Sequence, residues 1–343
     1  MKKLLSTVLA AVLCMGAFAG CGGESSTSSS GETASATGSA ASTASSASSG
    51  ASSEGESLTI GVSMNSADEF RTSLYNAIEA EANERGYEVI QTNADFDPSK
   101  QLSDVESLIQ KQPDVIVIFA VDGEAAVAAV DAVKAAGIGC VAVDFHINTD
   151  AYDVLIADNQ TLHGELQAQY VLDWLAEDES RVANVGYLIG AYMESALERR
   201  DGFVNACNSE INDRVTLLSE QCGNWMADDA MAITEDWIQR FPEMNVFVSM
   251  NDDMAIGCIQ ALKAAGRSMD DVLVLGIDGT VNGIASVREG DLDATTVVDV
   301  NGTADVVITT CEQVAAGEQF NGSTLEPGMI QLVTKDNVDE VVG

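Results

Sequence analysis

The sequence predicts an α/β protein of two lobes, each built on a mainly parallel, Rossmann-like sheet. Short unbroken runs rich in valine and isoleucine, such as 115–120 and 272–278, recur along the chain. Strands that are buried on both faces of a parallel sheet have this composition. Segments with helical periodicity separate the runs, which is typical of βαβ units. The alternation starts near residue 58 and restarts near 154, and the 286 residues from 58 to 343 suffice for two domains.

The first lobe is predicted to contain four strands connected by helices. Pro98 suits the first turn of a helix, and Gly86 and Gly137 suit the left-handed position that ends one. The predicted strands are 58–63, 87–92, 115–120 and 140–144, and the predicted helices are 70–85, 98–111 and 124–136.

The second half repeats the alternation. Its predicted strands are 154–158, 182–189, 215–220, 246–250, 272–278, 294–299 and 329–334. Its predicted helices are 161–176, one ending near 208, 227–240, 252–265, 281–288 and 303–316.

The N-terminus predicts export. Lys2 and Lys3 precede a short apolar run and small residues, which is the pattern of a signal peptide over 1–20. Phe18 to Cys21, followed by two glycines, resembles a lipobox, although an aliphatic residue is usual at the position of Phe18. We therefore expect a Gram-positive-style lipoprotein, lipidated at Cys21 and held at the extracytoplasmic face of the membrane by its lipid alone. Residues 22–57 are almost all Ser, Ala, Gly, Thr and Glu, which predicts a disordered tether.

Charge and cysteine content exclude several classes of function. The net charge is −38, and removal of the two lysines of the signal would make it −40. This argues against nucleic-acid binding, which requires basic surface. The five cysteines after Cys21 are scattered, which favours buried thiols, with a Cys207–Cys222 bridge as the alternative. No cysteine or histidine cluster indicates a metal site.

Polar and aromatic residues gather where the predicted strands end. Ligands of open parallel sheets bind beyond the carboxyl ends of the strands. Each residue also has a structural interpretation, because Asp68, Asp252 and Asp278 could cap helices and Trp225 could belong to the core. Together, these carboxylates, arginines and aromatic rings suit a polyhydroxylated ligand. The candidates are Asp68, Phe70, Arg71, Asp144, His146, Arg199, Trp225, Asn251, Asp278 and Asp299.

The chain resembles the type I periplasmic binding proteins of ABC sugar importers, with the pattern of the ribose-binding branch. The matching segments are IGVSMNSADEF, IGCVAVD, ALERRDGF, SMNDDMAIG and LGIDGT, in the order of the family. The resemblance implies ligand roles for Asp68, Phe70, Asp144, Arg199, Trp225, Asn251 and Asp278. Asn251 is expected to reach the ligand, whereas Asp252 and Asp253 start a helix.

Three departures from the ribose pattern predict a different ligand. Arg71 replaces the second aromatic residue of the first loop, and Phe145, followed by His146, replaces an arginine. Val298 aligns with a glutamine of the family, which leaves Asp299 as a substitute. We expect another monosaccharide, a polyol such as inositol, or a sugar-like signal molecule.

The resemblance also implies a three-segment hinge, with crossings near 157–158, 298–299 and 328–331. The first lobe would comprise 58–157 and 299–329, and the second 158–298 and 330–343. The expected function is that of a monomeric receptor that delivers its ligand to an ABC permease and needs no cofactor. A sensory receptor that docks on a chemoreceptor or histidine kinase is the alternative. An enzyme is disfavoured, because neither histidine lies in a recognisable catalytic motif and no phosphate-binding loop is present.

Overall fold

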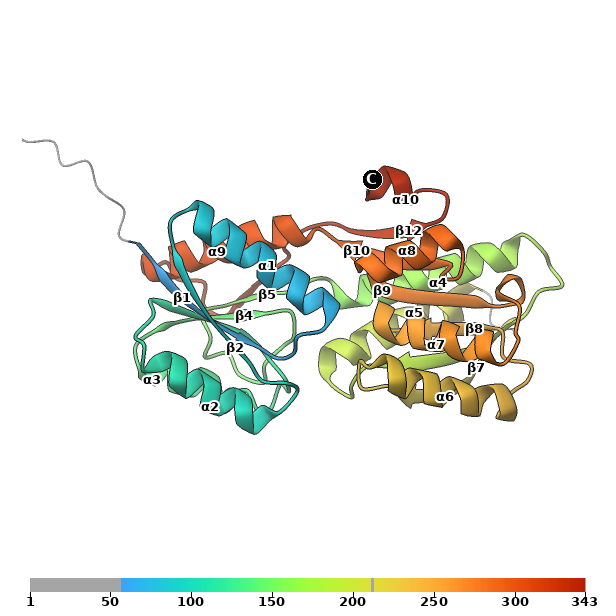
Figure 1. Ribbon diagram of the computed structural model, residues 1–343, viewed down its shortest axis with the longest axis horizontal. Helices are drawn as coiled ribbons and strands as arrows, with labels where there is room; N and C mark the ends of the chain where they lie inside the picture. Colours follow the sequence, from blue (N-terminus) through green and yellow to red (C-terminus); the bar gives the residue numbers. More distant parts are fainter. Residues whose placement is uncertain (1–56, 211–212, 343) are drawn as a thin grey trace, which may run out of the picture. The chain divides into compact units, whose positions relative to one another are not determined.

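The computed structural model describes residues 57–210 and 213–342. These residues form two α/β lobes, each around a six-stranded sheet (Figure 1). The predicted fold class is therefore confirmed. The predicted signal peptide, Cys21 and all of the predicted tether except Ser57 lie outside the described residues.

The first sheet has the strand order β11-β5-β4-β3-β1-β2, and every neighbouring pair is parallel. Helices α1 and α9 pack in one hydrophobic cluster on this sheet, and α2 and α3 pack in another. The elements are β1 (Thr59–Met64), α1 (Glu69–Glu84), β2 (Glu88–Asn93), α2 (Pro98–Ile109), β3 (Val115–Phe119), α3 (Val127–Ala135), β4 (Gly139–Val143), β5 (Val154–Ile156), α9 (Val300–Ala315) and β11 (Ser323–Leu325).

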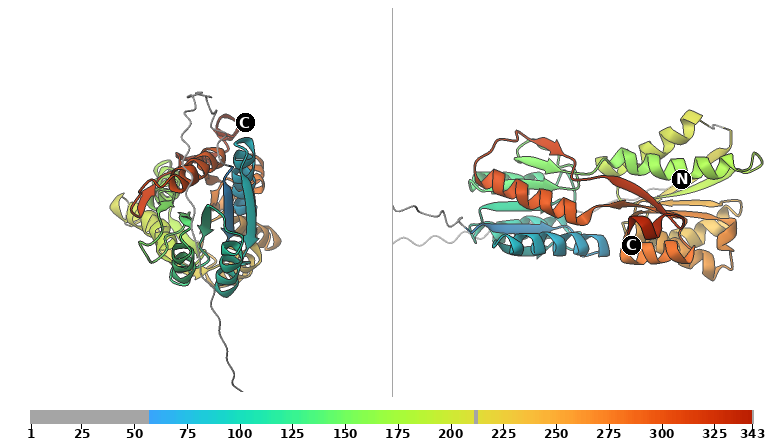
Figure 2. Two further views of the ribbon diagram at one scale, coloured as in Figure 1. Left: turned by 90° about the vertical axis from the view of Figure 1, so that its left-hand side faces the viewer. Right: turned by 90° about the horizontal axis from the view of Figure 1, so that it is seen from above.

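The second sheet has the strand order β12-β10-β9-β8-β6-β7. Its strands are parallel except for β12, which runs antiparallel to β10. Helix α4 packs against α5, and α7 packs between α6 and α8 (Figures 1 and 2). The elements are α4 (Gln160–Ala176), β6 (Ala183–Ile189), α5 (Glu194–Glu210), β7 (Val215–Cys222), α6 (Ala227–Arg240), β8 (Val246–Ser249), α7 (Asp252–Ala264), the 3-10 helix η1 (Met269–Asp271), β9 (Leu273–Asp278), α8 (Val281–Glu289), β10 (Ala294–Val298), β12 (Ile330–Thr334) and α10 (Val338–Val341).

The chain passes between the sheets three times, because β11 returns to the first sheet and β12 to the second. The exact crossing residues and lobe boundaries stay predictions. Helix α9 starts three residues before the predicted Thr303, because the carboxylate of Asp299 accepts a hydrogen bond from the backbone N of Gly302 (2.9 Å) and so caps the helix. Helix α3 starts at Val127 rather than at Glu124, because Asp122 holds the preceding residues in a turn.

The cysteines after Cys21 are free thiols, and the alternative Cys207–Cys222 bridge is absent from the described residues. Four of them are buried as predicted, whereas Cys222 is half-buried. None of the described helices has the length and apolar character needed to span a bilayer.

Candidate ligand-binding site

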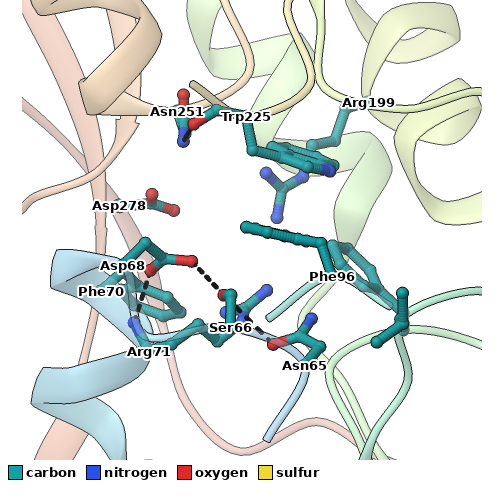
Figure 3. A pocket seen from close by; sticks show the side chains of 12 residues that line it. Asn65, Ser66, Asp68, Phe70, Arg71, Phe96, Arg199, Trp225, Asn251 and Asp278 are labelled. Atoms are coloured by element: carbon teal, nitrogen blue, oxygen red, sulfur yellow. Dashed lines mark hydrogen bonds between the residues drawn. The ribbon is translucent and has the colours of Figure 1, made fainter. Parts of the chain in front are cut away.

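A pocket lies between the strand ends of the two sheets (Figure 3). The loops after β1, β2, β3 and β4 contribute from the first lobe. The second lobe contributes α5, the loops after β7 and β8, and the end of β9. This is the position at which open parallel sheets bind ligands. The lining residues are Asn65, Ser66, Asp68, Phe70, Arg71, Phe96, Val121, Phe145, Arg199, Trp225, Asn251 and Asp278.

The backbone around the pocket is held in unusual conformations. Eight non-glycine residues of the described chain have positive φ. Three of these line the pocket, namely Phe96 (φ 60°), Trp225 (φ 63°) and Asp278 (φ 113°). Left-handed backbone is costly for residues with a Cβ, and such residues concentrate at functional sites. The loops therefore aim these side chains at the expense of local backbone stability.

Asp68 both caps a helix and lines the pocket. Its Oδ1 accepts a hydrogen bond from the backbone N of Arg71 (2.8 Å), which starts α1. Its Oδ2 accepts another from the hydroxyl of Ser66 (2.5 Å), as the dashed lines of Figure 3 show. The two interpretations of Asp68 drawn from the sequence are therefore compatible, since a carboxylate has further lone pairs for a ligand.

Arg71 is a buried cation with unused hydrogen-bonding capacity. It is 8% exposed and forms an ion pair with Asp144 through Nη2. Its Cζ lies 5.1 Å from the centroid of the Phe70 ring and 5.3 Å from that of Phe145, distances at which cation–π attraction operates. Its Nε is buried without a hydrogen-bond partner in the described chain. A buried donor of this kind is costly unless a ligand or water satisfies it.

Arg199 approaches the pocket from α5 in the second lobe. Its Nε donates to the side chain of Gln160, and its Nη1 donates to the carbonyl oxygen of Met250 (2.8 Å). The Cζ lies 5.9 Å from the centroid of the Trp225 ring. No described residue accepts a hydrogen bond from Nη2. Two of the three nitrogens therefore fix the guanidinium, and the third can bind a ligand oxygen.

Asp278 supplies an acceptor group at the end of β9. Its carboxylate accepts no hydrogen bond from the described residues, so both oxygens are available. Burial and the neighbouring carboxylate of Asp252 hold the pKa of Asp278 well above its usual range, and Arg199 and Arg71 offset part of this effect. Ligand hydroxyls that donate to Asp278 would replace the missing partners and stabilise the charged form.

Asn251 connects the helix after β8 to the aromatic wall of the pocket. Its Oδ1 accepts from the backbone N of Met254 (3.0 Å) and caps α7, while its Nδ2 donates to the carbonyl oxygen of Trp225 (3.1 Å). Asp252 and Asp253 begin α7 as predicted. Asn251 was expected only to reach the ligand, but it also caps α7.

Seven of the ten candidate residues line this pocket, and three do not. Asp144 lies behind Arg71 as its ion-pair partner. The ring of His146 lies near Tyr152 (centroids 6.5 Å apart), and His146 lines a different hollow beside Glu194 and Ser195. Asp299 caps α9 and also lies outside the pocket. Direct ligand contacts of these three residues are not supported by the geometry.

Five lining residues were absent from the sequence-based candidates: Asn65, Ser66, Phe96, Val121 and Phe145. Phe96 and Val121 follow the carboxyl ends of β2 and β3, where ligands of parallel sheets bind, so the sequence could have indicated them. Phe145 follows the end of β4 and is one of the departures from the ribose pattern, but it was not among the predicted ligand contacts; it is 4% exposed. Gln160, which orients Arg199, carries no sequence signal of its own.

The pocket offers hydrogen-bond donors, acceptors and aromatic faces to a ligand. Its free groups are the donors of Arg71 and Arg199 and the acceptors of Asp68 and Asp278, beside the rings of Phe70, Phe96 and Trp225. Within residues 57–210 and 213–342, no cluster of three His, Cys, Asp or Glu side chains could hold a metal ion.

Comparison with known proteins places this chain in one family. The model of the periplasmic binding protein domain matches residues 60–319. The ribose import binding protein of Bacillus subtilis is 31% identical over 241 residues, which are 70% of this chain and 76% of that protein.

Two further relatives carry other ligand names. A xylitol-binding protein of Mycolicibacterium smegmatis is 28% identical over 82% of this chain and 79% of that protein. A solute-binding protein of an ABC transporter from Bacillus halodurans, solved with bound myo-inositol, has a TM-score of 0.75 and 29% identity. The match covers 82% of this chain and 96% of that chain. The chain thus belongs to the periplasmic binding protein family, whose members bind substrates outside the cytoplasm.

Proposed function

We propose that this protein is an extracytoplasmic solute receptor that captures a neutral monosaccharide or polyol and delivers it to an ABC importer. The observation that carries the proposal is the set of unused polar groups in one pocket. Arg71, Arg199 and Asp278 all line it. The Nε of Arg71 is buried without a partner, and none of the described residues forms a hydrogen bond with the Nη2 of Arg199 or with the carboxyl oxygens of Asp278. Hydroxyl groups both donate and accept hydrogen bonds, so a polyhydroxylated molecule can satisfy all of them.

The charges of the pocket favour a neutral ligand. Arg71 is paired with Asp144, and the pocket contains one further cation, Arg199, and one further carboxylate, Asp68, while burial favours the neutral form of Asp278. These charges offset one another, so a neutral ligand meets no uncompensated charge in the pocket. The aromatic rings offer apolar faces to the C–H groups of a sugar ring.

The relatives support the same ligand class. The names of the two curated relatives refer to ribose and xylitol, and the solved structure holds myo-inositol. These are a pentose, a linear polyol and a cyclic polyol, and all three are neutral and of similar size. Family membership supports delivery of the ligand to an importer, and the N-terminal sequence supports a lipid anchor at Cys21. We propose that the receptor acts as a monomer.

A thermal-shift titration with D-ribose, xylitol and myo-inositol tests the proposal. A specific ligand at a hundred times its Kd stabilises the folded protein by about 2.7 kcal/mol. The expected result is a saturable rise in Tm with at least one compound. Polyols also stabilise proteins by exclusion from the surface, but that effect grows without saturation. A linear response to all three compounds would contradict binding of this ligand set.

A further inference from the structure

Phe145 occupies a central position among the charged and aromatic groups of the pocket. Its ring lies 5.7 Å from the Trp225 ring, centroid to centroid, with an interplanar angle of 29°. The guanidinium of Arg71 lies on it at 5.3 Å. Arg71 and Phe145 belong to the first lobe, and Trp225 to the second. Phe145 is thus the residue through which the aromatic walls of the two lobes touch.

The stacked rings leave no room for a sugar between them. Carbon atoms in contact are about 3.5–4.0 Å apart, so a ring inserted between two aromatic faces needs a separation of about 7–8 Å. The observed 5.7 Å is smaller. The ligand must therefore contact other parts of the pocket, such as Phe70 and the edge of the indole.

Polar contacts also join the lobes. The backbone N of His146, next to Phe145, donates to the hydroxyl of Ser195 (3.3 Å) in a half-buried position. Glu69 accepts hydrogen bonds from the backbone N and side chain of Asn282, and these groups are exposed to solvent. Exposed polar pairs contribute little, because water competes for the same groups. Phe145 is 4% exposed and Trp225 is half-buried, and an aromatic pair adds a geometric preference to its apolar burial. The orientation of Trp225 should therefore depend on Phe145.

We propose that Phe145 is a positioning residue of the site, which orients the Trp225 indole and the Arg71 guanidinium. The ligand itself does not lie between the rings of Phe145 and Trp225. The effect of Phe145 on affinity rests on the proposed function, whereas its effect on Trp225 does not. Removal of the ring releases the indole and uncovers the guanidinium. The affinity then falls because fewer molecules hold the binding-competent arrangement.

Two variants separate the aromatic role from simple packing. Phe145→Leu retains a buried apolar side chain without a ring, and Phe145→Tyr retains the ring. Phe96→Leu is the matched control, because Phe96 also lines the pocket but has no ring-stacking partner among the described residues. The first measurement is near-ultraviolet circular dichroism of the ligand-free proteins, in which the band lost in Trp225→Phe defines the signal of Trp225.

The expected result is that Phe145→Leu loses most of the Trp225 band, whereas Phe145→Tyr and Phe96→Leu keep it. Calorimetry with D-ribose, xylitol and myo-inositol should show a two- to tenfold weaker affinity in Phe145→Leu, with Phe145→Tyr within about twofold of the natural protein. An unchanged Trp225 band in Phe145→Leu would overturn the proposal. If none of the three compounds binds the natural protein, the proposed function fails, and the spectra still decide whether Phe145 orients Trp225.

Discussion

Asp252 holds three segments together behind the pocket. Its Oδ2 accepts hydrogen bonds from the backbone N (2.8 Å) and the hydroxyl (3.1 Å) of Thr280, and its Oδ1 accepts from the hydroxyl of Thr295 (2.7 Å). Thr280 in turn caps α8, two residues after Asp278. A Cβ at Gly283 would lie only 2.0 Å from the carboxylate, so this position requires glycine. Asp252 thereby fixes the turn that carries Asp278.

The buried carboxylate of Asp252 should make stability depend on pH. Burial raises its pKa to about 7, although the hydrogen bonds from Thr295 and Thr280 favour the charged form. Between about pH 4 and 7 the unfolded chain has released this proton and the folded protein still holds it. Its contribution therefore makes stability fall as pH rises through this range, by at most about 1.4 kcal/mol per pH unit, and level off above it. Urea unfolding of Asp252→Asn should lack this component.

The control for this measurement is Asp131→Asn, which changes an exposed carboxylate on α3. It should retain the pH profile of the natural protein. If the stability of Asp252→Asn ran parallel to that of the natural protein between pH 4 and 7, burial of a protonated Asp252 would be disproved.

Two of the departures from the ribose pattern occupy neighbouring positions in space. Relative to that pattern, an arginine has replaced an aromatic residue at 71, and an aromatic residue has replaced an arginine at 145. The structure brings these side chains into contact and pairs Arg71 with Asp144. Relative to that pattern, the cation and the ring therefore stand at each other's chain positions, and in this chain they contact one another. A specificity role for Arg71 stays a prediction, and His146 lies outside the pocket.

At the level of elements, the close packing of α4 and α5 positions Arg199. A Cβ at Gly164 would lie 1.9 Å from the carbonyl oxygen of Arg199, and one at Gly202 would lie 2.2 Å from that of Thr161. The two helices approach so closely because each has a glycine at the contact. Gln160, at the start of α4, then reaches the guanidinium of Arg199.

Gly164→Ala should therefore force the two helices apart. Overpacking of this kind costs about 1–3 kcal/mol, and in this case it also shifts Arg199 relative to Gln160. Chemical denaturation should show a lower unfolding midpoint with an unchanged slope. Glu165→Ala is the matched control, because it changes the exposed neighbour on the same helix and should remain within about 0.5 kcal/mol. Equal midpoints for Gly164→Ala and the natural protein would refute this account of the contact.

The sequence was most informative about elements whose residues act locally. Apolar runs located the parallel strands, and the strand-end rule located Asp68, Arg199 and Asp278. Strand β11 was not predicted, because its three residues, Ser-Thr-Leu, contain no apolar run and become a strand only by pairing with β5. Phe145 was not predicted as a pocket residue, because its ring packs on Trp225, a residue 80 positions away in the other lobe. Contacts between distant segments have no local pattern from which they could be predicted.

The whole molecule contributes to the site by bringing two lobes to one ligand. Asp68 and Arg71 come from the first lobe, and Arg199 and Asp278 from the second. A ligand that binds both pairs interacts with both lobes, and these contacts are complete only when the lobes are together. Binding therefore favours the closed arrangement, as expected for hinge motions around a ligand.

Calorimetric titration decides whether the ligand binds in this pocket. The natural protein, Arg199→Ala and Asp278→Ala are each titrated with whichever of D-ribose, xylitol and myo-inositol raises the Tm of the natural protein. Each substitution leaves ligand hydroxyls unpaired in a desolvated pocket, which costs about 1–3 kcal/mol. We expect one site per chain and a loss of affinity of about tenfold to a hundredfold in each variant. Glu165→Ala should bind like the natural protein. An affinity unchanged in both site variants would show that this pocket is not where the sugar binds.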